Sequence, residues 1–192
     1  MRTFLFIVLL AGLSSAYAQV EIPLTESVEC TIMQKNNFSY CLNKETYTAQ
    51  WTALRISAEE IETHQPLPSD LQFFPGIKQY ANLVWPKLEN QVKLWALEFD
   101  SVYVVSGKVP QTSDTSISNA EIYFKAILKG CQGDAIGFLI NMNDSGTLSS
   151  FSLTIDSLEA LTHFDFFPSL NTDLQEIIES RFNPDFWPIS VE

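Results

Sequence analysis

The residues that most directly suggest chemistry are the chain's two histidines, His64 in "ETHQPLP" and His163 in "SLEALTHFDFFPSL". Histidine has an ordinary pKa close to neutral pH, so either side chain could act as a general base. His64 lies in an acidic, proline-rich stretch that is typical of a solvated side chain, and we retain it only as a candidate base. No Gly-x-Ser-x-Gly turn is present to anchor a serine-based triad.

A helix is predicted between the two histidines, in "NLVWPKLENQVKLWALEF". Its apolar residues recur at steps of three and four, as on one face of an amphipathic helix: Val84, Leu88, Val92, Trp95 and Phe99. We expect the helix to begin near Asn82 and to run to about Phe99. Pro86 is compatible with this helix only in its first turn.

The other predicted elements are mostly short strands, in runs rich in β-branched and aromatic residues. These runs are residues 27–33, 39–43, 50–57, 102–106, 121–128 and 135–140. The last is almost wholly apolar, so we expect it to be central and covered on both faces. Residues 58–81 contain several prolines and acids and indicate a loop or a broken helix.

Two further helices are predicted near the C-terminal end, over residues 154–162 and 172–182. We expect Thr172 to open the second one, with Gln175 three residues on as the partner in a capping box. Strands mixed with helices in irregular order predict an α+β fold.

The first eighteen residues, "MRTFLFIVLLAGLSSAYA", resemble a secretory signal peptide. A basic Arg2 precedes an apolar core of about ten residues, too short for the roughly twenty that span a bilayer, and small residues follow. We expect cleavage before Gln19, one domain over residues 19–192, a secreted and extracellular protein, and no membrane span. The formal net charge of −12 disfavours a nonspecific nucleic-acid binder, because such a field repels polyphosphates.

The three cysteines fit this compartment, since disulfides form and persist outside the cytosol. Cys30 and Cys41 are close in sequence and flank a turn-like run, so we predict a disulfide between them. Cys131 would then be a free thiol, an intermolecular partner or a buried thiol. Asn37 and Asn143 each begin a glycosylation sequon.

The segments "VYVVSGKVP", "EIYFKAIL", "AIGFLI" and "SLEALTHFDFFPSL", with "WPKLENQ" upstream, resemble in order and spacing the DNA/RNA non-specific endonuclease family. The family includes endonuclease G and the nuclease-like domain of ectonucleotide pyrophosphatases/phosphodiesterases. The resemblance covers residues 28–186. It implies the ββα-metal nuclease fold, in which a mainly antiparallel sheet is flanked by helices.

The resemblance also implies a mechanism. A histidine from an Asp-Arg-Gly-His motif takes a proton from water, and Mg²⁺ held by an asparagine stabilises the developing charge at phosphorus. This chain has no Asp-Arg-Gly-His, and its interval between Ser57 and Trp85 is shorter than the family's. The metal-binding asparagine falls on Ala81. Asn82, one position away, and Glu89, which matches an acidic position of the family helix, are therefore the candidate metal residues.

His163 falls where the family has a glycine in a turn before paired phenylalanines, so we interpret it as structural. Phe164, Phe166 and Phe167 are expected to anchor that turn onto the sheet. Among the tryptophans, only Trp187 is predicted to be exposed enough for a carbohydrate platform.

Three functional hypotheses remain. The first is a secreted family member whose active site has degenerated, leaving a domain that binds an extracellular partner. The second is an active Mg²⁺-dependent nuclease that hydrolyses DNA or RNA, either through His64, Asn82 and Glu89 or because an internal exon carrying the base is missing from this sequence. The third is an unrelated secreted binding module. Nucleic acid is a partner by resemblance and is disfavoured by charge.

Overall fold

The computed structural model describes residues 22–24, 30–35, 38–74, 77, 84–110, 121–130, 133–141, 144–181 and 183–190. Some of the predicted features fall outside these residues: the signal peptide, both sequons at Asn37 and Asn143, the positions of Ala81 and Asn82, and Cys131.

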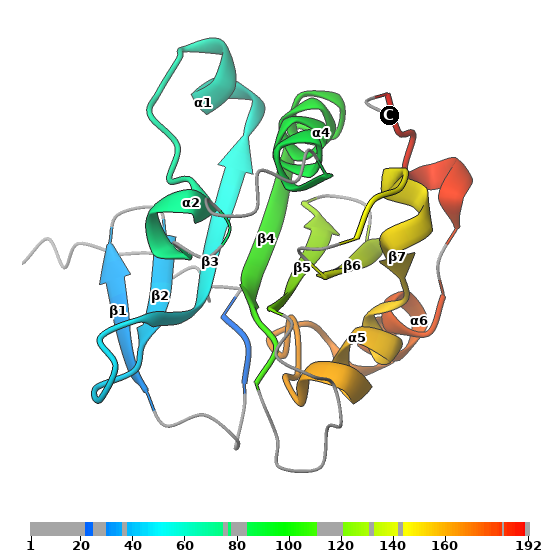
Figure 1. Ribbon diagram of the computed structural model, residues 1–192. Coiled ribbons are helices and arrows are strands. Elements are labelled where there is room, and N and C mark those ends of the chain that lie inside the picture. Colours follow the sequence, from blue (N-terminus) through cyan, green and yellow to red (C-terminus); the bar gives the residue numbers. More distant parts are fainter. Residues whose placement is uncertain are drawn as a thin grey trace, which may run out of the picture.

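The centre of the fold is a seven-stranded antiparallel sheet whose strands lie in sequence order, β1 to β7 (Figure 1). The strands are β1 (Thr31–Lys35), β2 (Phe38–Leu42), β3 (Ala49–Ser57), β4 (Ser101–Lys108), β5 (Ile122–Lys129), β6 (Ala135–Asn141) and β7 (Ser152–Leu153). Neighbouring strands are therefore consecutive in the chain, although α1, α2 and α4 intervene between β3 and β4.

Helices cover both faces of this sheet. They are α1 (Ala58–Glu62), α2 (Asp70–Phe73), α4 (Val84–Glu98), α5 (Ile155–Thr162) and α6 (Thr172–Glu179), with short 3₁₀ turns η1 (Leu148–Phe151) and η2 (Pro184–Phe186). In Figure 1, α4 lies on one side of the sheet and α5 and α6 on the other. The described elements therefore form an α+β fold, as predicted.

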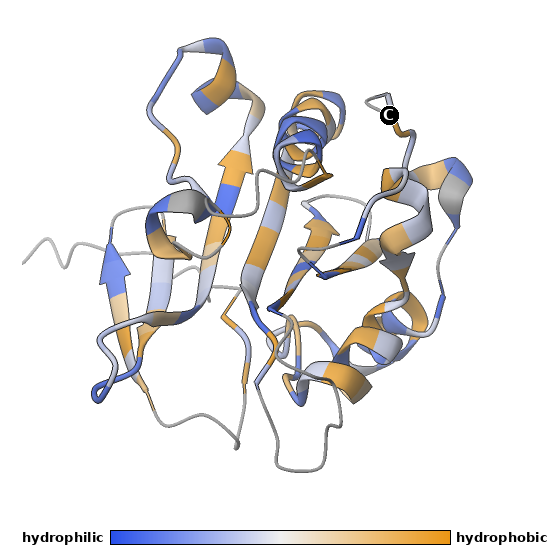
Figure 2. Cartoon of the chain, viewed as in Figure 1, coloured by the Kyte–Doolittle hydropathy of each residue, from blue (hydrophilic) through white to orange (hydrophobic). Residues whose placement is uncertain are grey.

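Two hydrophobic clusters result from the alternation of side chains along the strands. On β5, Tyr123 and Ile127 join the cluster under α4, whereas Phe124 and Ala126 join the cluster under α5 and α6. Figure 2 shows hydrophobic residues along much of β3 to β6, consistent with a sheet covered on both faces.

The amphipathic pattern of α4 correctly predicted both its position and its buried face. The helix covers Val84–Glu98, with Pro86 in the first turn, where the missing N–H of proline costs nothing. Leu88 and Trp95 are fully buried against the sheet.

The apolar run 135–140 became β6, which is covered on both faces as expected but is not central. It is the sixth of seven strands and pairs with the two-residue β7. Its outer neighbour is therefore short, and burial comes from the helices: Ile136 and Phe138 face the α4 cluster, whereas Ala135 faces the opposite cluster.

The ends of the short helices are determined by side-chain caps. Ser57 and Glu60 form a capping box at the start of α1, within a stretch whose prolines and acids had indicated only a loop or a broken helix. The prediction that Thr172 caps the last helix was wrong by one residue. Asn171 is the N-cap, its Oδ1 accepting the N–H of Asp173 at 3.0 Å, and Gln175 instead donates to Asp165 Oδ1 at 3.0 Å.

Trp187 is 1% exposed, so the predicted carbohydrate platform is wrong. The segment after α6 crosses back to α4, where Trp95 Nε1 donates to the carbonyl of Pro188 at 2.8 Å and Trp187 packs edge-on against Trp95. Lys129 Nζ lies over the ring of Phe99, 3.9 Å from its centroid, and burial lowers the pKa of this ammonium. The burial of Trp187 against Trp95 therefore completes the core on the α4 side.

Cys30 and Cys41 form the predicted disulfide, which links the residue before β1 to β2, with their Cα atoms 5.6 Å apart. In the part of the chain that the structure describes, no helix is long and apolar enough to cross a membrane.

Candidate functional site

A small open pocket of about 80 Å³ lies between α4 and the sheet. Its apolar lining comes mainly from β3, β4 and the segment before α2, and its polar lining comes from Ser69, Asp70, Glu89, Lys93 and Lys125. Glu89 is one of the two residues that the sequence proposed for metal binding, and α4 directs it toward this pocket.

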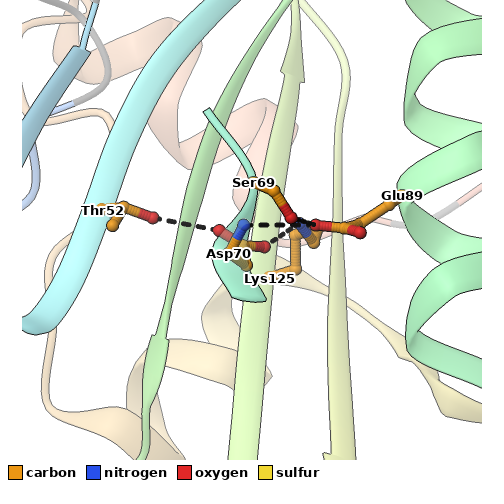
Figure 3. A network of polar contacts seen from close by, with 5 residues as sticks. All are labelled: Thr52, Ser69, Asp70, Glu89 and Lys125. Carbon is orange, nitrogen blue, oxygen red and sulfur yellow. Dashed lines mark hydrogen bonds and ion pairs between the residues drawn. The ribbon is translucent and has the colours of Figure 1, made fainter. Parts of the chain in front are cut away.

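The strongest interaction in the pocket is the ion pair between Asp70 and Lys125. Lys125 Nζ lies 2.6 Å from Asp70 Oδ2, and both side chains are buried (Figure 3). The other carboxylate oxygen of Asp70, Oδ1, accepts the hydroxyl hydrogen of Thr52 at 3.2 Å. Both oxygens of Asp70 are therefore already engaged, which is what a buried carboxylate requires.

Lys125 reaches this position because of its register on β5. It shares a face with Tyr123 and Ile127, so it points toward α4 from the middle of a strand whose other lysine, Lys129, is its last residue. Its ammonium also lies over the ring of Trp85, 4.9 Å from the centroid, a cation–π contact. Trp85, which belongs to the family-like run "WPKLENQ", therefore contacts the ammonium of Lys125.

Glu89 holds the beginning of α2 in place. Its Oε1 accepts the backbone N–H of Asp70 at 3.3 Å and the hydroxyl of Ser69 at 3.4 Å. These bonds connect α4 to the segment that carries Asp70, across 19 residues of sequence. Glu89 thus positions the partner of Lys125.

Neither histidine of the chain lines the pocket. His64 follows α1, is exposed, and has Nδ1 3.0 Å from the backbone oxygen of Glu62. His163 is the C-cap of α5, on the side of the sheet opposite α4, and its φ of 59° lies in the left-handed region that favours glycine. This conformation agrees with the structural role that we expected for His163.

The phenylalanines after His163 anchor the turn as expected. Phe164, Phe166 and Phe167 are buried, and the rings of Phe164 and Phe166 lie 5.3 and 5.4 Å from the ring of Phe124 on β5.

The described pocket residues do not fit a divalent metal ion. A hard cation requires free oxygen ligands, yet Asp70 is occupied by Lys125 and Thr52, and the Oε1 of Glu89 already accepts two hydrogen bonds. The ammonium of Lys125 would also repel a second cation. Asn82, the other proposed ligand, lies outside the described residues.

Sequence reasoning missed Asp70 and Lys125, which are 55 residues apart. The signal that could have found Lys125 is a charged residue at an inward position of an apolar strand, since lysine is almost never fully buried unless it is paired. No comparable signal identifies Asp70, which is one of several acids in its segment.

A helix packed on an antiparallel sheet, with a polar pocket between them, makes this chain an α+β protein, in agreement with the ββα-metal nuclease-like fold that the resemblance implies. A family profile described as DNA/RNA non-specific endonuclease matches residues 74–173, a range that contains α4, Glu89 and Lys125. The chain belongs to this family.

The solved structures support the same fold. A chain of the crystal structure entitled "Crystal structure of the EndoG/EndoGI complex: Mechanism of EndoG inhibition" matches with a TM-score of 0.53 at 12% sequence identity. The match covers 75% of this chain and 88% of that chain. No curated protein matches the chain at a significant level.

Proposed function

We propose that this protein is a secreted, catalytically degenerate member of the DNA/RNA non-specific endonuclease family, which uses the nuclease fold for binding and not for phosphodiester hydrolysis. The observation that carries the proposal is the buried pair of Lys125 and Asp70 in the pocket that Glu89 lines.

A hydrolytic site for phosphodiesters needs a base near neutral pKa and a cation available to the substrate. The buried ammonium of this pocket, that of Lys125, is bonded to Asp70, and neither histidine lines the pocket. The absence of an Asp-Arg-Gly-His sequence anywhere in the chain supports the same conclusion.

The test is hydrolysis of plasmid DNA and of RNA by the purified mature protein, with Mg²⁺ or Mn²⁺ and again with a chelator. We expect no cleavage under any of these conditions. Chelator-sensitive cleavage that is lost in Glu89→Ala, but kept in Glu98→Ala, would overturn degeneracy and support the alternative of an active Mg²⁺-dependent nuclease.

Glu98 is a matched control because it lies on the same helix, is exposed, and its replacement changes the net charge equally. Cleavage that is equal in the wild type and in both variants would indicate a contaminating nuclease.

Nucleic acid is the partner named by the family description, but the net charge of −12 favours a different class of partner. We therefore propose that the domain binds an extracellular protein. A direct check is electrophoretic mobility of DNA and RNA with increasing protein at physiological salt. Retention at micromolar protein would contradict this part of the proposal.

Secretion is supported by the signal-like first eighteen residues and by the disulfide between Cys30 and Cys41, because disulfides persist in oxidising compartments. N-terminal sequencing of protein recovered from the culture medium should begin at Gln19. A mass shift on deglycosylation, lost in Asn37→Gln or Asn143→Gln, would identify the sequons in use. Retention of the chain inside the cell with its first residues intact would contradict secretion.

A further inference from the structure

A cluster of three carboxylates lies on the face of the sheet opposite the pocket. Asp156 is in the first turn of α5, Glu159 is in the middle of that helix, and Glu179 is the last residue of α6. One oxygen from each lies within 4.8 Å of the others. Two helices that are separate in sequence thus bring three acidic groups together.

Glu179 provides an independent indication that something binds here. Its side chain is only 6% exposed, and its buried Oε1 has no hydrogen-bond partner. A buried carboxylate oxygen without a hydrogen-bond partner is costly when the group is ionised, and a cation bound by the cluster that Glu179 shares with Asp156 and Glu159 would offset that cost. It also lies at the C-terminal end of α6, where the helix dipole disfavours negative charge.

The charged groups that affect the pKa values of Glu159 and Glu179 are all acidic. Burial, followed by the charge of Glu159, raises the pKa of Glu179 to about 7, and Asp165 and Asp156 add to the effect. A hydrogen bond with neutral Gln175 opposes it. Burial likewise raises the pKa of Glu159 to about 7, although its Oε1 accepts the N–H of Phe166 at 2.7 Å.

The spacing of the oxygens suits the size of calcium. Two ligands on opposite sides of one Ca²⁺ can lie ~5 Å apart, twice a Ca–O distance, whereas the limit for Mg²⁺ is ~4.2 Å. The upper limit of 4.8 Å between these oxygens is therefore closer to the span of Ca²⁺ than to that of Mg²⁺. Asp156 is exposed, so water can complete the coordination.

We propose that Asp156, Glu159 and Glu179 form a binding site for one Ca²⁺-sized divalent cation that links α5 to α6. This site is independent of the proposed function, because the α4 pocket and the cluster lie on opposite faces of the sheet. Binding would neutralise the buried carboxylate of Glu179 and fasten α6 to the rest of the fold.

The experiment is calorimetric titration of the mature, disulfide-bonded protein with CaCl₂ at pH 7.5, paired with thermal unfolding in Ca²⁺ or chelator. We expect one ion per chain and a Tm increase of ~5–10 °C at a hundredfold excess over Kd. Glu179→Gln and Glu159→Gln should each lose the binding heat and the Ca²⁺-dependent part of the Tm increase. MgCl₂ should give a smaller increase than CaCl₂.

Glu176→Gln is the matched control, since Glu176 is an exposed residue of the same helix and its replacement removes the same charge. It should keep the full Ca²⁺ response. If the wild type gives no binding heat and no Tm increase, or if Glu179→Gln responds to Ca²⁺ as the wild type does, the proposal is wrong. Because the readout is the difference between Ca²⁺ and chelator, a change in the basal stability of a variant does not affect it.

Discussion

Lys125 Nζ lies 2.6 Å from Asp70 Oδ2, with both side chains buried beneath α4. In this member of an endonuclease family, the buried cation of the pocket belongs to the chain itself and is paired with a carboxylate of the same chain. The charge of this pocket is thus balanced internally, without a ligand.

Removing one partner of this pair should be strongly destabilising, because it leaves the other charge buried and unpaired. We expect Lys125→Met to lower the free energy of unfolding by about 3–5 kcal/mol, measured by urea denaturation. The double variant Asp70→Asn, Lys125→Met should recover a large part of that loss. If the losses of the two single variants simply add in the double variant, the pair is not energetically coupled.

Stability should fall as the pH rises through the range set by Glu159 and Glu179. Each carboxyl has an ordinary pKa of 4.5, which the fold raises to about 7, so between these values the folded state binds more protons than the unfolded state. The stabilising effect of protonation is fully present below about 4.5 and lost by about pH 7. We expect a contribution on the order of 1–3 kcal/mol, measured by denaturation in chelator from pH 4.5 to 8.

The same reasoning predicts that Glu179→Gln flattens this dependence. The variant should be less sensitive to pH than the wild type and more stable than it at pH 8 without added cation, because the amide carries no charge. A pH profile that is unchanged by the substitution would show that Glu179 does not titrate in this range.

The observed cap of α6 gives a prediction that distinguishes Asn171 from Thr172. Asn171→Ala removes the oxygen that accepts the N–H of Asp173 and should cost about 1 kcal/mol. Thr172→Ala should cost less, since Thr172 is the first helical residue and alanine is the better helix former. Equal losses for the two variants in denaturant unfolding would contradict this assignment.

The left-handed conformation of His163 predicts that glycine is tolerated there. A non-glycine residue at a φ of 59° carries a conformational cost, so His163→Gly should raise the free energy of unfolding by about 1 kcal/mol. Thermal unfolding would measure the change. A large loss of stability would mean that the imidazole itself contributes more than the backbone strain costs.

The sequence predicted the parts of this fold that depend on local periodicity. The apolar residues at steps of three and four from Val84 to Trp95 indicated α4 and its buried face. The close spacing of Cys30 and Cys41 indicated the disulfide. The order of the family-like segments predicted a family to which the chain does belong.

The candidate site depended on information that local patterns do not contain. Asp70 and Lys125 meet because β5 and the start of α2 face the same pocket. The two residues are 55 positions apart, so no local sequence pattern predicts their contact. The exposure predicted for Trp187 was wrong for a related reason, because its burial depends on contact with Trp95 of the distant α4.

The return of the C-terminal segment to α4 affects the order in which the chain can fold. Trp187 fills the core beside Trp95, and Gln91 donates to the carbonyl of Pro188 at 3.1 Å while its own Oε1 accepts the N–H of Ser190 at 2.7 Å. Because Pro188 follows Gln91 by 97 residues, the α4 side of the core stays open until this later segment has been synthesised. A chain truncated before Trp187 would therefore present the apolar face of α4 to chaperones and proteases.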